Sequence, residues 1–173
     1  MPASFPSGGD EEARRSVPGP SPMTTNESRR VRLEIASRFD MLEMVQTVLG
    51  HLCGQLGFGE DEAHYANVAV RESLVNAIRH GNKMDESKRV AVEFVMSPDR
   101  LEVNVQDEGA GFDLESLPDP TAEANILKAS GRGIFFMRSF MDDVRYTFAP
   151  KGGTLVRMVK KRLGVAPAPL ARE

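Results

Sequence analysis

The sequence predicts an α+β fold, a two-layer α/β sandwich in which helices cover one face of a mixed, mostly antiparallel sheet. Segments with the alternating pattern of strands occur together as hairpins, rather than each being separated from the next by a helix. Two long segments with helical spacing come as one block between the first strand and the first hairpin. This grouping is typical of antiparallel sheets with helices on one side.

Composition narrows the class of protein before any motif is considered. The 173 residues are enough for one domain with a core, and 22 basic against 25 acidic residues give a formal net charge of -3. A protein held to nucleic acid by phosphate contacts usually shows a basic excess, so we expect no direct nucleic-acid partner. We also expect no membrane partner and a cytoplasmic location, because the chain has no apolar run of membrane length, no secretory signal and a single cysteine, Cys53.

The expected domain spans residues 31–162. Residues 1–30 hold several prolines, glycines and serines with little to bury, so we expect a disordered N-terminal extension. Residues 163–173 are expected to form a flexible tail.

The first half of this domain is predicted to be one strand followed by two helices. Apolar and charged residues alternate over 31–35, which indicates a half-buried strand. Apolar residues recur at helical spacing over 39–56, and a pair of glycines ends that helix. The next helix begins near residue 60 with acidic side chains in its first turn and continues to Gly81-Asn82.

The second half is predicted to contain two hairpins separated by a long loop and a helix. The first hairpin turns at Ser97–Arg100, and a glycine-rich loop, DEGAGFD, follows it. Residues 113–130 lack clear periodicity and are expected to form a long mobile loop. The remaining expected elements are a helix from Ile134 to about Met141 and strands over 144–148 and 154–160.

The segment at residues 70–82, VRESLVNAIRHGN, is an amphipathic helix with two stripes. One stripe is apolar and consists of Val70, Leu74, Ala77 and Ile78. On nearly the opposite side, Glu72 and Asn76 lie one turn apart, so both side chains can act on one small object. A carboxylate can accept a proton, and an amide oxygen can bind a hard cation such as Mg²⁺. Alone, this polar stripe is also consistent with a solvated helix face.

Three glycine-containing segments accompany this helix. Asp107-x-Gly109-x-Gly111 directly follows a strand, Gly131-x-Gly133 directly precedes a helix, and Gly153-Thr154 opens the last strand. Each segment by itself is common in turns and loops. The order and spacing of these three segments and the helix together are what indicate a function.

With these segments the chain resembles the GHKL superfamily of ATP-binding domains, which includes DNA gyrase, histidine kinases and mismatch-repair ATPases. Within it, the chain resembles the bacterial anti-sigma factor and serine-protein kinase family of the RsbW and SpoIIAB type. ESLVNAIRHGN is similar to the N box, DEGAGFD to the first glycine box, SGRGIFFMRSFMDDV to the lid glycine box and GGT to the last. The resemblance covers about residues 31–161 and implies the histidine-kinase-like ATPase fold. The absence of a Walker sequence is consistent with it.

The resemblance implies ATP and Mg²⁺ as cofactors and assigns residues to the base end of the nucleotide. Asp107 would accept a hydrogen bond from the adenine amino group. Gly109 and Gly111 would let the backbone approach the nucleotide. Thr154 would place its hydroxyl near the adenine through water.

The same resemblance assigns the phosphate end. Asn76 would be the metal ligand, and Glu72 would be the general base that takes a proton from the attacking hydroxyl. Gly131 and Gly133 would expose backbone N–H groups to phosphate oxygens, and the helix that starts at Ile134 would add its positive end. Arg132 and Lys128 would offset charge on the γ-phosphate. For His80 we expect a structural role at the helix end.

The function implied is an anti-sigma factor with protein serine/threonine kinase activity. It would sequester a sigma factor, phosphorylate an anti-anti-sigma partner of the STAS type and form a homodimer. Two alternatives remain open: an ATP-binding sequestering module without phosphotransfer, and the catalytic domain of a histidine kinase. Against the second, the chain has no H-E-x-x-x-P phosphoacceptor sequence, and His51 lies in a different context, GHLCG.

Overall fold

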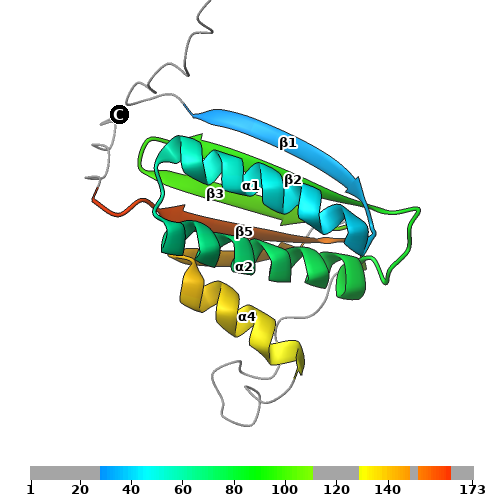
Figure 1. Cartoon of the computed structure of the whole chain (residues 1–173). Helices are drawn as coiled ribbons and strands as arrows, with labels where there is room; N and C mark the ends of the chain where they lie inside the picture. Colours follow the sequence, from blue (N-terminus) through cyan, green and yellow to red (C-terminus); the bar gives the residue numbers. More distant parts are fainter. Residues whose placement is uncertain (1–27, 111–128, 149–151, 165–173) are drawn as a thin grey trace, which may run out of the picture.

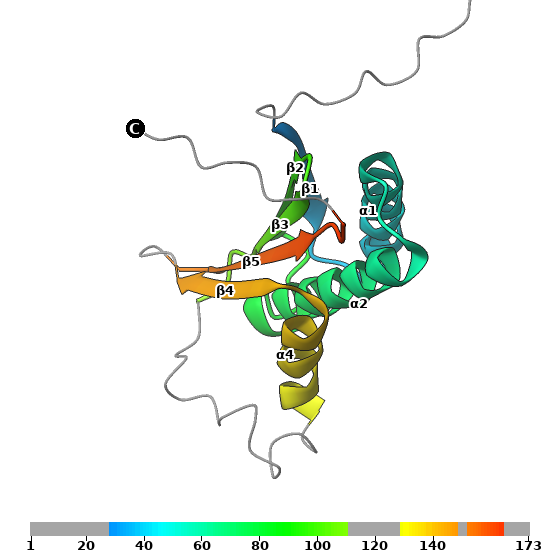
Figure 2. The same ribbon diagram turned by 90° about the vertical axis from the view of Figure 1, so that its left-hand side faces the viewer.

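A five-stranded sheet forms one layer of the structure, and three α-helices lie on one of its faces (Figures 1 and 2). The structure is a computed structural model that describes residues 28–110, 129–148 and 152–164. The strand order is β1-β2-β3-β5-β4. Its strands are β1 (Arg29–Ala36), β2 (Arg89–Ser97), β3 (Arg100–Gln106), β4 (Asp143–Phe148) and β5 (Thr154–Lys161).

The predicted α+β sandwich is confirmed, and the sheet is wholly antiparallel across the described strands rather than mixed. The chain passes from β3 through a helix to the edge strand β4. The β4–β5 hairpin then places β5 between β3 and β4. As a result β5 runs antiparallel to both of its neighbours.

The helices correspond to the expected block plus one later helix. α1 (Leu42–Leu56) is preceded by a 3₁₀ turn, η1 (Phe39–Met41), and ends at Gly57, whose φ of 71° is the left-handed conformation that glycine adopts readily. α2 (Glu60–Asn76) continues into a π-helical turn, η2 (Ala77–Gly81). The third helix is α4 (Ala129–Phe140).

Two expectations about the ends and the long loop stay predictions. β1 begins at Arg29, two residues before the expected start of order, whereas residues 1–27 lie outside the described part of the chain. Residues 113–128 of the expected loop and the tail from residue 165 also lie outside the described part, whereas residues 129 and 130 belong to a helix rather than to the loop. Among the helices that the structure does describe, none combines the length and the apolar character that crossing a membrane requires.

The core lies between the helices and the face of the sheet that they cover. β2 and β3 present every second residue to it, and the apolar stripe of α2 packs there as predicted. Leu74 and Ile78 are fully buried, and Val70 and Ala77 are at most 5% exposed. The buried side chains of β2 and β3 are Val90, Val92, Phe94, Met96, Leu101, Val103 and Val105.

The other face of the sheet is polar. Arg157 of β5 forms ion pairs with Glu102 of β3 and with Asp143 of β4, the latter at 3.2 Å. Asn104 donates a hydrogen bond to Glu102 at 3.0 Å, and a cavity of about 320 Å³ opens over these side chains. The alternation of apolar and polar residues in the strands therefore separates a helix-covered face from a water-facing one.

We predict that Leu74→Ala lowers the free energy of unfolding by about 2–5 kcal/mol, because it leaves a cavity in a fully packed region. Urea unfolding followed by circular dichroism measures this value. The matched control is Met44→Ala on α1, whose side chain is 46% exposed and which should change stability by less than about 0.5 kcal/mol. Equal effects of the two substitutions would contradict the assigned core.

Candidate functional site

The helix that carries Gly131 and Gly133 begins earlier than predicted. We expected it to start at Ile134, with both glycines in the preceding loop, but α4 starts at Ala129 and includes them. The N–H of Gly131 stays within the first turn, where N–H groups have no partner in the helix, whereas that of Gly133 lies beyond it. The prediction that Gly133 lies in a loop before the helix is therefore wrong, and its contact with phosphate stays a prediction.

Packing against α2 explains why a glycine lies at position 133. It is buried, and a Cβ built there would lie 3.0 Å from Oε2 of Glu72 and 3.5 Å from Nδ2 of Asn76. A larger residue would require the Glu72 carboxylate to shift by a few tenths of an ångström. The structure thus brings Gly133 of one predicted segment against Glu72 and Asn76 of another.

Glu72 and Asn76 lie on the side of α2 that packs against α4, and both are half-buried. The Glu72 side chain is 30% exposed, and the guanidinium of Arg71 lies 4.0 Å from it, between Nη1 and Oε1. An ion pair that long and that exposed contributes little to stability. The carboxylate consequently remains accessible to a group that approaches from solvent.

Asp107 lies at the other end of this region and is held by the backbone. Its side chain is in a residue only 5% exposed, and Oδ1 accepts hydrogen bonds from the N–H of Gly109 at 2.8 Å and of Thr154 at 3.1 Å. Burial raises the pKa of the Asp107 carboxyl above its ordinary value, and the two backbone hydrogen bonds oppose that rise. Such a carboxylate is a fixed, desolvated acceptor.

Glycines from three separate segments enclose Asp107. A Cβ at Gly81 would lie 2.4 Å from Cγ of Asp107, and one at Gly153 would lie 2.3 Å from its backbone oxygen. A Cβ at Gly109 would lie 2.3 Å from the backbone oxygen of Gly81. No real side chain fits at such distances, so the close approach of these segments requires glycine. We call Gly81, Gly109 and Gly153 the glycine cradle.

The sequence reasoning missed two residues of this arrangement. Gly81-Asn82 was interpreted as a helix stop, but Gly81 forms a wall of the cradle and Asn82 is fully buried. The Asn82 side chain donates to the backbone oxygen of Arg89 at 2.9 Å and accepts from the N–H of Glu108 at 2.8 Å. It joins the end of α2 to β2 and to the segment after β3.

The end of α2 departs from the predicted continuous α-helix. The N–H of Asn82 bonds to the oxygen of Ala77 at 2.7 Å, which closes the π-helical turn η2. Lys83 and Met84 then adopt left-handed φ values of 58° and 60°, which are uncommon in residues other than glycine. Such turns occur often at functional sites, and this one places Gly81 against Asp107.

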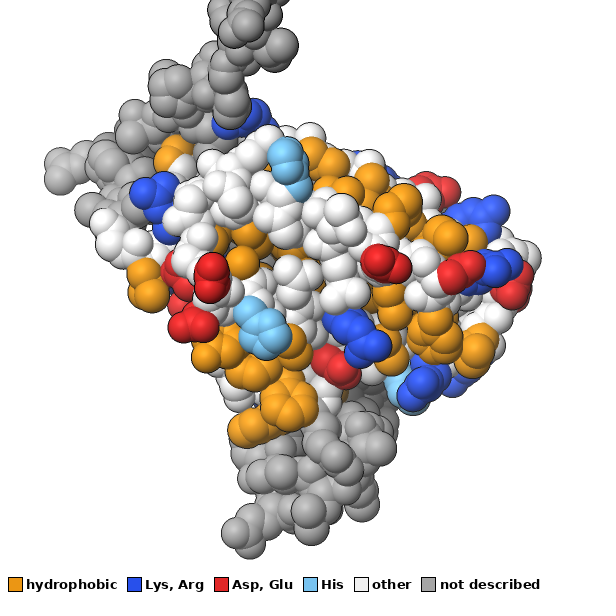
Figure 3. All heavy atoms as spheres, viewed as in Figure 1, with side chains coloured by type: hydrophobic (Ala, Val, Ile, Leu, Met, Phe, Trp, Pro, Cys, Tyr) orange, Lys and Arg blue, Asp and Glu red, His pale blue; other side chains and the backbone are white. Residues whose placement is uncertain are grey.

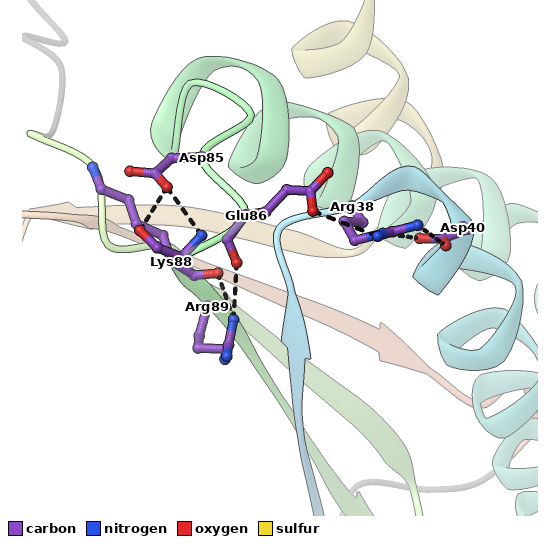
Figure 4. A network of polar contacts seen from close by, with 7 residues as sticks. Arg38, Asp40, Asp85, Glu86, Lys88 and Arg89 are labelled. Atoms are coloured by element: carbon purple, nitrogen blue, oxygen red, sulfur yellow. Dashed lines mark hydrogen bonds and ion pairs between the residues drawn. The ribbon is translucent and has the colours of Figure 1, made fainter.

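The loop between η2 and β2 is also tied to β1 and η1. Figure 4 shows the Arg38 side chain between Asp40 and Glu86, at 2.8 Å and 3.4 Å. Arg89 donates from its side chain to the backbone oxygen of Glu86 at 3.1 Å. These contacts are exposed and individually weak, but together they limit the positions the loop can take.

Thr154 has a buried hydroxyl beside the Asp107 carboxylate. Within residues 28–110, 129–148 and 152–164 this hydroxyl makes no hydrogen bond of standard geometry. It is nevertheless close enough to the carboxylate to lower the pKa of Asp107. Asp107 and Thr154 therefore form one buried polar pair bordered by glycine backbone.

The remaining predicted residues are placed as follows. His80 lies on the surface. Partial loss of water around its ring, and then the positive charges of Arg79 and Lys83, lower the pKa of His80, which favours the neutral imidazole at pH 7. Ile134 is half-buried on α4 next to Gly133. Gly111, Lys128 and the side chain of Arg132 lie outside the described residues, so their roles stay predictions.

Glu72 and Asn76 are connected to the glycine cradle through one helical rod. Asn76 ends α2 and Gly81 ends η2, five residues further, which corresponds to about 7 Å along the axis. The second half of this rod thus carries a carboxylate and a carboxamide and, five residues after Asn76, the glycine that borders the buried Asp107 carboxylate.

Comparison with known proteins adds to this geometry. The family model of the histidine kinase-like ATPase domain matches residues 35–160. The chain is 27% identical over 122 residues to serine-protein kinase RsbW of Listeria monocytogenes serovar 1/2a, covering 67% of this chain and 78% of that protein. It is 28% identical over 126 residues to serine-protein kinase RsbW of Bacillus subtilis strain 168, covering 69% and 79%.

A solved structure shares the fold. It is the crystal structure of the RsbU and RsbW domains of a Mycobacterium tuberculosis protein, which matches with a TM-score of 0.57 and 15% identity. The match covers 78% of this chain and 32% of that longer chain. At this identity the likeness concerns the fold alone.

We predict that Gly81→Ala lowers the free energy of unfolding by about 1–3 kcal/mol, because the added Cβ must displace the buried Asp107 side chain. Thermal or urea unfolding measures the change. The control is Gly54→Ala in α1, where no atom lies within 4 Å of the added Cβ and stability should rise by about 0.5–1 kcal/mol. An unchanged free energy of unfolding in Gly81→Ala would contradict the prediction and show that the glycine cradle can relax.

Proposed function

The chain belongs to the family of histidine kinase-like ATPase domains, and from this premise we propose that it is an anti-sigma factor with ATP-dependent protein serine/threonine kinase activity. It sequesters a sigma factor and phosphorylates an anti-anti-sigma partner of the STAS type. The observation that carries the proposal is that one helical rod bears Glu72 and Asn76 and, five residues after Asn76, Gly81, which packs against the buried Asp107. The relatives named serine-protein kinase RsbW support it.

The cradle is proposed to hold the adenine end of ATP. Asp107 is a buried acceptor whose Oδ1 is already fixed by two backbone donors, so the carboxylate is oriented before a ligand arrives. Thr154 places its buried hydroxyl beside that carboxylate. Gly109 lets the backbone come close to the ring, and Gly111 is proposed to continue that contact.

The Glu72 and Asn76 end is proposed to serve the phosphates. Asn76 offers an amide oxygen to Mg²⁺, and Gly131 contributes a free N–H in the first turn of α4. Ile134 and Gly133 place that turn against α2, while Arg132 and Lys128 are proposed to supply positive charge. When bound, ATP supplies the phosphoryl group that is transferred.

Glu72 is proposed to act on the incoming hydroxyl. Its carboxylate accepts the proton as the acceptor's oxygen bonds to the γ-phosphorus and the bond from that phosphorus to the bridging oxygen breaks, with ADP leaving. The 30% exposure of the Glu72 side chain is consistent with an acceptor that comes from a second protein. Incubation with γ-labelled ATP, Mg²⁺ and anti-anti-sigma proteins tests the activity by scoring label on serine or threonine. ATP binding and sigma-factor capture without any transfer would favour the sequestering module.

We predict that Asp107→Asn weakens ATP binding about 30- to 100-fold, because the acceptor-only carboxylate is lost. Calorimetry measures the affinity, and an unchanged value would contradict the adenine assignment.

The same variant should be at least as stable as wild type at neutral pH without nucleotide. A folded-state pKa raised by burial means that wild type loses stability as pH rises through it, whereas Asn has no charge to bury. The advantage of Asp107→Asn should therefore shrink as pH falls toward the ordinary carboxyl value of 3.8. Urea unfolding at several pH values measures this difference, and an advantage that grows on acidification would show that the pKa is not raised.

We predict that Glu72→Gln and Asn76→Ala fail in different ways. Glu72→Gln keeps size and hydrogen-bonding capacity but removes the base, so it should bind ATP and the sigma factor like wild type and transfer phosphate at least about 100-fold more slowly. Asn76→Ala should weaken Mg·ATP binding itself, since a metal ligand acts in the ground state too. Wild-type transfer by Glu72→Gln would exclude Glu72 as the base.

A further inference from the structure

Four aromatic side chains form a continuous row across α2 and α4. Tyr65 of α2 stacks on Phe140 of α4, with ring centroids 4.9 Å apart, and Phe140 stacks on Phe136 at 5.7 Å. Phe135 meets Phe136 edge-on at 6.0 Å. We call these four residues the aromatic row.

Most of the row is exposed to water. Tyr65, Phe135 and Phe136 are 39%, 41% and 39% exposed. Figure 3 shows hydrophobic side chains gathered over α4 and its border with α2. Stacking of Phe140 on Tyr65 holds the two helices together, but that packing does not require a phenylalanine at 135, which points outward. Contiguous exposed apolar surface of this kind marks interaction sites.

The row lies beside the proposed site of phosphate transfer. Tyr65 meets Phe140 and Glu72 meets Gly133, so α2 and α4 run antiparallel with these pairs in register. Seven residues separate the two pairs on each helix, which is two turns or about 10 Å. A protein resting on the row is therefore within reach of the Glu72 carboxylate.

We propose that the aromatic row is the docking surface for the protein that accepts the phosphoryl group. This inference rests on the proposed kinase function. An acceptor protein must hold its hydroxyl at Glu72, and contacts remote from the reacting atoms supply the binding free energy for that positioning. Exposed aromatic side chains inside a polar rim are typical anchors of protein interfaces.

The surroundings of the row favour a protein over a small molecule. Cavities of about 320 and 130 Å³ open on the polar face of the sheet, whereas the row lies on the helices. On α2, the exposed Asp61 is one helical turn before Tyr65, and on α4 the exposed Arg138 is one turn after Phe135. The acceptor is accordingly expected to present an apolar centre between a basic and an acidic edge, which would orient it on the row.

The first test measures KM and kcat for an acceptor protein that wild type phosphorylates. Phe135→Ser and Phe136→Ser should each raise KM for the acceptor at least about 10-fold, while kcat at saturating acceptor and calorimetric ATP affinity stay at wild-type values. The matched control is Met44→Ser, an equally exposed apolar residue on α1, which should leave KM unchanged. An unchanged KM in both phenylalanine variants would overturn the proposal. So would an equal loss of ATP affinity, or a loss of sigma-factor capture with phosphotransfer intact.

The second test does not depend on turnover. A photo-crosslinking amino acid is placed at position 135 or at position 44 of the full chain, and each protein is irradiated with ADP, Mg²⁺ and the purified anti-anti-sigma protein. Position 135 should crosslink to that protein and position 44 should not. Crosslinking from position 44 alone, or from neither position, would overturn the docking surface. Absence of label transfer by wild type would instead overturn the kinase function, so the two failures are distinguishable.

Discussion

The buried carboxylate of Asp107 imposes the constraint on which the rest of the site depends. An ionised group removed from water is unfavourable unless donors surround it, and here the backbone N–H groups of Gly109 and Thr154 provide them. To supply those donors, the chain must come within van der Waals distance of the carboxylate on several sides at once. Glycine is the residue that permits this, which explains the glycine cradle. These donors do not fully offset the loss of water, so the pKa of Asp107 is raised above its ordinary value.

The rod formed by α2 and η2 fixes the position of Glu72 and Asn76 relative to Asp107. Its apolar stripe, with Leu74 and Ile78 fully buried, fixes the rod on the sheet. Its polar stripe is then aimed at α4, and its π-helical end delivers Gly81 to Asp107. Asn82 locks that end to β2 and to the segment after β3 through two hydrogen bonds. A single helix thereby sets the spacing between the proposed base-binding and phosphate-binding groups.

The third helix combines two roles that compete for the same surface. Gly133 lets α4 pack closely on Glu72 and Asn76, whereas two turns away the helices are held by large stacked rings. Aromatic stacking contributes about 0.5–1.5 kcal/mol beyond burial, enough to keep α4 in place where glycine contributes little. The outward Phe135 and Phe136 exceed what this packing needs, which is why we assign them to a partner.

The sequence by itself determined the α+β class, the order of strands and helices, the buried stripe of α2 and the grouping of Glu72, Asn76, Asp107 and Thr154 into one family pattern. Periodicity reports burial within one element, and hydrophobic burial drives each element to the face that it predicts. Only the tertiary structure decided where α4 begins, because packing on α2 accommodates glycines that weaken a helix by local propensity. It also decided that Gly81 and Asn82 support Asp107 and that Tyr65 meets Phe140, since contacts between residues distant in the chain leave no local periodic pattern.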